Sequence, residues 1–179
     1  MEVIKMSQKG KITVRQLTIT AIFMAINVAL SSSIFSIPVP GGHLYVNDIV
    51  ICTAALMFDP FSAFAVGGLG AFIGDLLFYP APMFVSLVTH GLQAVVISLS
   101  VRYLGKKNET VGTVIGLVLG VVINVVGYSL GRAFIYSTPE QAALKLPFQI
   151  LQASVGAAIA PVLCYAFKLK KVYTRYLAL

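Results

Sequence analysis

Apolar residues form six long runs along the chain, separated by short polar or proline-containing segments. A helix rises 1.5 Å per residue, so about 20 apolar residues span the hydrocarbon core of a bilayer. The runs predict helices at about residues 17–37, 47–58, 61–79, 83–103, 111–135 and 142–167. The second run is short, so its helix is expected to begin deep in the membrane or to tilt. We predict an all-α membrane protein, a six-transmembrane-helix bundle in which residues 1–179 form a single integral-membrane domain.

The composition agrees with this pattern. Hydrophobic residues make up 58% of the chain and charged residues only 11%, with a mean hydropathy of +0.91. A soluble domain has about a quarter charged residues. The pI near 9.5 is compatible with nucleic-acid binding in principle. Apart from Arg132 and Lys145, the positive charge lies in segments that flank the apolar runs or at their ends, however, which is typical of a topology signal.

The distribution of cations predicts the orientation. All but Arg132 and Lys145 of the 13 Lys and Arg residues fall before the first helix, at the end of the fourth helix or in the loop after it, or after the sixth helix. Clustered cations tend to stay on the cytoplasmic side of a membrane. We therefore expect both termini to be cytoplasmic, in a multi-pass protein of the prokaryotic plasma membrane.

Small residues recur at helical spacing on three of the predicted helices. They are Ala21, Ala25 and Ala29 on the first, Gly67, Gly70 and Gly74 on the third, and Gly112, Gly116 and Gly120 on the fifth. Small side chains let membrane helices approach closely. We expect the glycine stripes to pack inside the bundle, whereas the alanine face also suits docking to another membrane protein.

Polar side chains within the apolar runs are costly and are functional candidates by default. Here they gather in the predicted outer half and in the first outer loop. The candidate substrate-binding residues are His43, Tyr45, Asp75, Tyr79, His90, Gln93, Asn124, Tyr128, Gln149 and Gln152. Aromatic faces stack on planar rings, and amides and imidazoles bond ring nitrogens and hydroxyls. With few net charges nearby, this set predicts a small, neutral or weakly charged heteroaromatic ligand.

Each candidate also has a structural alternative. Asp75 and Arg132 could neutralise one another, and His90 could bond a backbone carbonyl. Tyr79 and Tyr128 could belong to an interfacial aromatic belt, and Gln149 and Gln152 could only join helices. The joint depth of these residues on several helices favours a pocket over these separate explanations.

These residues and their arrangement resemble the S-component, the substrate-binding membrane subunit, of an energy-coupling factor (ECF) vitamin transporter. The resemblance covers nearly the whole chain. It rests on the six short helices, the alanine face of the first helix and three stretches: Pro40-Gly-Gly-His-Leu-Tyr, Asp59-Pro-Phe-Ser-Ala-Phe and Gly74-Asp-Leu-Leu-Phe-Tyr-Pro-Ala-Pro-Met-Phe. Together these stretches are similar to members assigned to hydroxymethylpyrimidine or pyridoxine uptake.

The resemblance implies a mechanism and partners. An S-component captures a vitamin outside the cell, and the loop between its first two helices closes as a lid. It then joins a membrane coupling protein (the T-component) and two cytoplasmic ATPase subunits, and topples in the membrane to release its cargo. The coupling face in such proteins corresponds here to Ala21, Ala25 and Ala29. The family site corresponds to residues of the first loop and the last three helices in the candidate set.

The sequence also bears on enzymatic roles. No Gly-x-x-x-x-Gly-Lys-Ser/Thr phosphate loop occurs, so the chain has no such site for ATP. Cys52 and Cys164 lie on different predicted helices, with neither a plausible disulfide pairing nor further ligands for a metal. An intramembrane enzyme could use His43, Asp48, Asp75 and His90 as metal ligands, but no tight spacing such as His-Glu-x-x-His occurs. We expect no enzymatic activity, cofactor or metal. The alternative function is an autonomous carrier of a small neutral metabolite, in which Asp75 and His90 relay protons.

Overall fold

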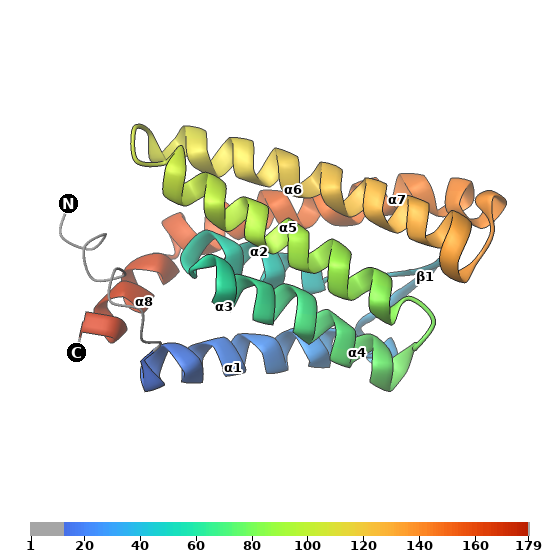
Figure 1. Cartoon of the computed structure of the whole chain (residues 1–179), viewed down its shortest axis with the longest axis horizontal. Coiled ribbons are helices and arrows are strands. Elements are labelled where there is room, and N and C mark those ends of the chain that lie inside the picture. The colour runs from blue at the N-terminus through green and yellow to red at the C-terminus, as the bar shows by residue number, and fades with distance from the viewer. Residues whose placement is uncertain (1–12, 179) are drawn as a thin grey trace.

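The long helices run side by side along the long axis of the molecule (Figure 1). The structure, a computed structural model, describes residues 13–178. The helical elements are α1 (Val14–Leu30), η2 (Ser33–Phe35), α2 (Asn47–Met57), α3 (Pro60–Phe64), η3 (Ala65–Leu69), α4 (Gly70–Phe78), α5 (Met83–Tyr103), α6 (Glu109–Gly131), η4 (Arg132–Tyr136), α7 (Pro139–Pro161), η5 (Val162–Ala166) and α8 (Leu169–Ala178). The π-helical turn η3 joins α3 and α4 into one continuous helix, and η4 and η5 continue α6 and α7 at their C-terminal ends.

The predicted membrane bundle is confirmed in its class. Within the described residues, four helices are long and apolar enough to cross a bilayer: Pro60–Phe78, Met83–Tyr103, Glu109–Tyr136 and Pro139–Ala166. The apolar helices α1 and α2 are shorter, with 17 and 11 residues. The number of six crossings and the cytoplasmic placement of the termini therefore stay predictions.

The first helix was predicted to run to residue 37, but α1 ends at Leu30. Ser31 donates its backbone N–H and its hydroxyl to the carbonyl of Asn27, which closes the last turn. A residue before proline is pushed out of the helical region, so Ile37, before Pro38, takes an extended conformation. The chain there forms β1 (Ile37–Val39), which pairs antiparallel with β2 (Gly42–Leu44). This hairpin was not predicted.

Two boundaries near the C-terminus also differ from the prediction. The last long helix begins at Pro139 rather than at 142, because Thr138 caps it and proline is well suited to the first helical position. After η5, the chain turns at Lys168, whose φ is +58°, and forms the unpredicted α8. Leu169 and Tyr173 of α8 pack against the buried core.

The described basic residues at the start of α1, in the α5–α6 loop and in α8 lie at the opposite end of the bundle from the hairpin (Figure 1). The start of α1, the α5–α6 loop and α8 share one end, and the hairpin and the α4–α5 and α6–α7 connections share the other (Figure 1). The cation distribution predicted that these three basic segments lie on the same side of the membrane, and in the structure they share one end of the bundle. We call the second end the hairpin end.

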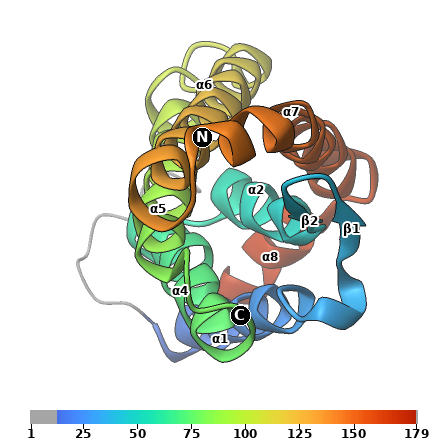
Figure 2. The same cartoon turned by 90° about the vertical axis from the view of Figure 1, so that its right-hand side faces the viewer.

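The short helix α2 occupies the middle of the bundle, and the other helices surround it (Figure 2). Nine of its 11 residues are buried, and they include Ile51, Ala54 and Leu56. A helix enclosed by other helices needs no lipid-facing surface, so α2 does not have to match the thickness of the bilayer. Its first residues, Asn47 and Asp48, are buried polar groups that point to a site beside them.

The glycine stripes pack inside the bundle, as expected. A Cβ on Gly67 would lie 2.8 Å from the carbonyl oxygen of His90, and one on Gly120 would lie 2.6 Å from Ile97 Cδ1. By contrast, the three alanines of α1 are exposed, while Asn27 on the opposite face donates to the carbonyl of Val66 at 2.7 Å. The alanine face is therefore free for a partner within the described part of the chain.

Candidate functional site

The site is built around one buried carboxylate at the start of α2. Asp48 is 1% exposed. Its Oδ1 accepts hydrogen bonds from Asn124 Nδ2 at 2.9 Å and Gln93 Nε2 at 3.2 Å, and its Oδ2 accepts from Gln152 Nε2 at 2.7 Å. Buried polar groups are stable only when they are paired. Three helices, α5, α6 and α7, are thus joined to α2 through side-chain amides.

The same network orients His90. Gln93 Nε2 faces Asp48, so its Oε1 faces His90 Nδ1 at 2.8 Å and also accepts from Asn124 Nδ2 at 3.0 Å. Because an amide oxygen can only accept, the proton between these two atoms belongs to His90 Nδ1. The His90 ring packs edge-on against Tyr128, with 5.2 Å between centroids. An imidazole ring thus lies beside an aromatic ring.

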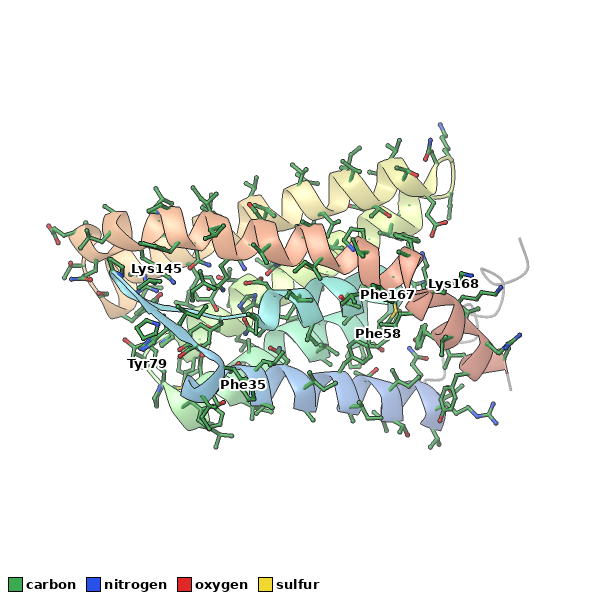
Figure 3. The ribbon with its side chains drawn as sticks, turned by 180° about the vertical axis from the view of Figure 1, so that it is seen from behind. Phe35, Phe58, Tyr79, Lys145, Phe167 and Lys168 are labelled. Atoms are coloured by element: carbon green, nitrogen blue, oxygen red, sulfur yellow. The ribbon has the colours of Figure 1, made fainter. Side chains whose placement is uncertain are left out.

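A cavity of about 150 Å³ lies between this network and the hairpin. Its wall is formed by polar and aromatic side chains from the hairpin end of most helices. The lining residues are Ser31, Gly42, His43, Tyr45, Asn47, Ala71, Asp75, Tyr79, Pro82, His90, Tyr128, Arg132, Tyr136, Lys145, Gln149 and Gln152. Figure 3 shows Tyr79 and Lys145 at the hairpin end, far from Phe58 and Phe167.

The hairpin is tied down across the cavity by three side chains. Arg132 Nη1 donates to the carbonyl of Gly41 at 2.6 Å, and Lys145 Nζ donates to the carbonyl of His43. The Tyr45 N–H donates to Gln152 Oε1 at 3.0 Å. The turn itself depends on glycine, because Gly41 has a φ of +80°. The structure therefore has the loop in a closed position over the cavity.

The predicted site residues converge at this place. All of them except Gln93 and Asn124 line the cavity, and those two lie behind its wall, where they bond Asp48. Gln149 Nε2 donates to Asn124 Oδ1 at 2.6 Å, so it serves both the wall and the network. Whether these residues bind a substrate stays a prediction.

Three of the structural alternatives, for Asp75 with Arg132, for His90 and for Tyr128, do not match the contacts. Asp75 accepts from the Ser86 hydroxyl, whereas Arg132 donates to Gly41, so these two do not form a direct ion pair. His90 bonds the side chain of Gln93 rather than a backbone carbonyl. Tyr128 donates its hydroxyl to Ser86 at 2.6 Å, which turns it into the bundle.

Sequence reasoning left Asp48, Arg132 and Lys145 out of the site. Each is a charged residue within or beside an apolar run, and that was the signal available. Arg132 also shares a helix face with Asn124 and Tyr128 at four-residue spacing. Lys145 was counted only as a cation of the outer side, yet it is 3% exposed.

The electrostatics of the wall favour neutral donors beside the hairpin. Burial raises the pKa of Tyr45, and the nearby Asp75 adds to this shift. Its hydroxyl is therefore protonated at neutral pH. Among residues 13–178, no group of three or more His, Cys, Asp or Glu side chains is placed to hold a metal ion. The arrangement can bind and enclose a small polar ring.

Comparisons with known proteins agree with this architecture. Residues 11–169 match the model of the family described as "ECF-type riboflavin transporter, S component". The match spans every residue of the cavity wall. A protein from Pyrococcus woesei, described as "Uncharacterized protein in gap 3'region", is 29% identical over 144 residues, which cover 79% of this chain and 94% of that protein.

Proposed function

The chain belongs to the family of ECF-type riboflavin transporter S-components, and we propose that, as an S-component, it captures a one-ring heteroaromatic vitamin or precursor, hydroxymethylpyrimidine or pyridoxine. S-components are membrane-embedded substrate-binding subunits of ECF transporters, without enzymatic activity of their own, and they act with a T-component and ATPase subunits. The ligand, its side of entry and the residues that bind it are the proposal.

The closed cavity carries this proposal. An engineered apolar cavity of about 150 Å³ holds one benzene molecule, and the cavity here has about the same volume. A single ring with small substituents therefore fits beneath the closed hairpin. The Tyr128 ring, the His90 imidazole and the Gln149 amide offer a stacking face and donors and acceptors around it. These are the groups that a pyrimidine or a pyridine with hydroxyl substituents requires.

A flavin is the second candidate, because the family whose model the chain matches is named for riboflavin. Its three fused rings and sugar-like chain are much larger than one ring. A flavin would need the hairpin to move away from Arg132 and Lys145 before it could enter the cavity. Relative affinities for riboflavin and for the one-ring compounds separate the two candidates.

Delivery depends on partners in this proposal. The ligand enters at the hairpin end, the hairpin closes over it, and the exposed alanine face of α1 then docks onto the T-component. Ala21, Ala25 and Ala29 leave a smooth surface there, on which a partner helix can approach closely. Hydrolysis of ATP by the partner ATPases then drives release into the cytoplasm.

Mass spectrometry of the small molecule that co-purifies with the chain tests the ligand directly. Calorimetric titration with hydroxymethylpyrimidine, pyridoxine and riboflavin then ranks the candidates. The double change Tyr128→Ala and Gln152→Ala should weaken binding of the preferred compound by about 1 kcal/mol or more, because it removes an aromatic face of the cavity and the amide that holds the hairpin and Asp48. Tyr103→Ala, on a 67% exposed residue at the opposite end, is the control.

Two results would contradict this function. Unchanged affinity in the double variant would place the ligand elsewhere. Uptake of the ligand into liposomes that contain this chain alone, driven by a pH gradient, would support the autonomous carrier instead. In that carrier Asp75 and His90, which both line the cavity, would relay the protons.

A further inference from the structure

Two cations face the cavity beneath the hairpin. Arg132 and Lys145 both belong to its wall, one from η4 and the other from α7. Lys145 is 3% exposed, and Arg132 is partly buried. Within residues 13–178, the one Lys or Arg side chain with a carboxylate oxygen closer than 4.0 Å is Lys170, which faces Glu109, so neither of the two cavity cations has a carboxylate partner.

Their present partners compensate them only in part. Arg132 donates to the carbonyl of Gly41, and Lys145 donates to the carbonyl of His43. A carbonyl carries a partial charge, and a buried cation without a counterion is costly. A guanidinium has five donors and stays charged in proteins, and a lysine ammonium has three donors. Both side chains therefore have donors beyond those that hold the hairpin.

The acids of the site have partners of their own. Asp48 accepts from three amide groups on α5, α6 and α7. Asp75 accepts from the hydroxyl of Ser86. The two cations therefore lie under the hairpin without a carboxylate of the described chain within 4.0 Å, although Arg132 also lies over the Tyr136 ring at 5.3 Å. The sequence predicted a site with few net charges, and the two cations change that description.

We propose that the ligand carries an acidic substituent, a carboxylate or a phosphate monoester, which binds Arg132 and Lys145 beneath the hairpin. This inference rests on the proposed function and deepens it, since it selects the ionised members of the one-ring heteroaromatic class. The planar fork of an arginine matches carboxylate and phosphate oxygens in two parallel bonds, and a lysine adds a point charge. The ring then lies against Tyr128 and His90, whose rings pack edge to face.

The same contact explains how binding would hold the hairpin closed. Arg132 and Lys145 already bond the turn and the second strand. An acid between them would fix both side chains in these positions. The acidic group of the ligand, the two cations and the hairpin then form one connected set of charge-assisted hydrogen bonds.

Titration calorimetry with matched pairs of compounds tests the proposal. The pairs are pyridoxine with pyridoxine phosphate, hydroxymethylpyrimidine with its phosphate, and riboflavin with flavin mononucleotide. Pyridoxic acid is the carboxylate arm, which separates recognition of a carboxylate from recognition of a phosphate. We expect at least one acidic compound to bind the full-length chain about tenfold or more tightly than its neutral counterpart, since charge-assisted bonds exceed neutral ones.

Variants assign the effect to the two cations. Lys145→Met and Arg132→Gln should each reduce the ratio of acidic-compound to neutral-compound affinity about tenfold. Both side chains also hold the hairpin, so affinity for the neutral compound falls as well, and the ratio of the two affinities is the readout. Lys145→Arg should retain most of the preference, which guards against loss of folding as the cause. Lys106→Gln, in the loop at the opposite end, is the control and should behave as the wild type.

The outcomes separate this inference from the proposed function. If a neutral one-ring compound binds as tightly as its acidic partner, the inference fails and the proposed function stands. An acidic preference that persists in Lys145→Met and Arg132→Gln also overturns it. If no one-ring compound binds in either form, both proposals fail.

Discussion

Replacement of Asp48 by asparagine should destabilise the bundle, although the two side chains have almost the same shape. The carboxylate accepts from Gln93 and Asn124 through one oxygen and from Gln152 through the other. An amide has one acceptor oxygen and one NH₂ group. Whichever way the new amide turns, its NH₂ faces at least one donor. Rotating Gln152 would remove that conflict only by taking its Oε1 away from the N–H of Tyr45.

The expected magnitude follows from the burial of these groups. One buried donor without an acceptor costs about 1–3 kcal/mol. Polar contacts between membrane helices are weaker, at about 0.6 kcal/mol on average. Asp48, however, is 1% exposed and its bonds are charge-assisted, so the upper range applies. We expect Asp48→Asn to lower the free energy of unfolding by about 1–3 kcal/mol.

Reversible unfolding in mixed micelles, followed by circular dichroism, measures this difference. Asp75→Asn is the matched control, because Asp75 accepts from Ser86 and the amide oxygen of asparagine can replace that acceptor. The control should lose less than about 1 kcal/mol. Equal stability of wild type, Asp48→Asn and Asp75→Asn would show that Asp48 does not organise the network.

Three further changes test other parts of the structure. Ala25→Trp should abolish uptake by the assembled transporter and leave the ligand Kd unchanged. Val126→Trp, on the exposed face of α6, is the control and should keep uptake. If Ala25→Trp loses ligand binding and uptake equally, the interface proposal is wrong. Gly67→Ala should lower the free energy of unfolding by about 1–3 kcal/mol, because its Cβ would lie 2.8 Å from the carbonyl of His90; unaltered stability in the same micelle assay would contradict this close packing. Gly41→Ala should speed amide hydrogen exchange across the hairpin, because a φ of +80° strains a residue with a Cβ by about 1–2 kcal/mol. An unchanged exchange rate would show that the turn tolerates the side chain.

The membrane class and the place of the cavity could be predicted because both depend on the cost of polar groups in lipid. Apolar runs must become helices in a bilayer, where unpaired backbone groups are expensive. His90, Tyr128 and Gln149 lie on separate helices, and polar side chains at similar depth lower that cost by facing each other. Convergence on one cavity follows from this requirement, without knowledge of the packing.

The sequence could not predict which polar residues line the cavity and which bond Asp48 behind its wall. Asn124 and Gln149 have the same chemistry and similar depth, yet Asn124 bonds Asp48 behind the wall while Gln149 lines the cavity. Which amide reaches the carboxylate depends on rotamers and on how far α2 extends into the bundle. The short run at residues 47–58 gave no sign that its helix lies at the centre.

The hairpin and the floor of the cavity are parts of one short stretch of chain. Only Val46 and Asn47 separate Tyr45, which closes the hairpin, from Asp48. Gln152 bonds both ends of this stretch, since its Oε1 accepts from the Tyr45 N–H and its Nε2 donates to Asp48. Opening the hairpin therefore removes an acceptor from Tyr45 and loosens the amide that holds Asp48. Because those groups are costly to leave unpaired, opening the hairpin and disrupting the hydrogen bonds of Asp48 are one event. A ligand that replaces the lost hydrogen bonds lowers the free-energy cost of that opening.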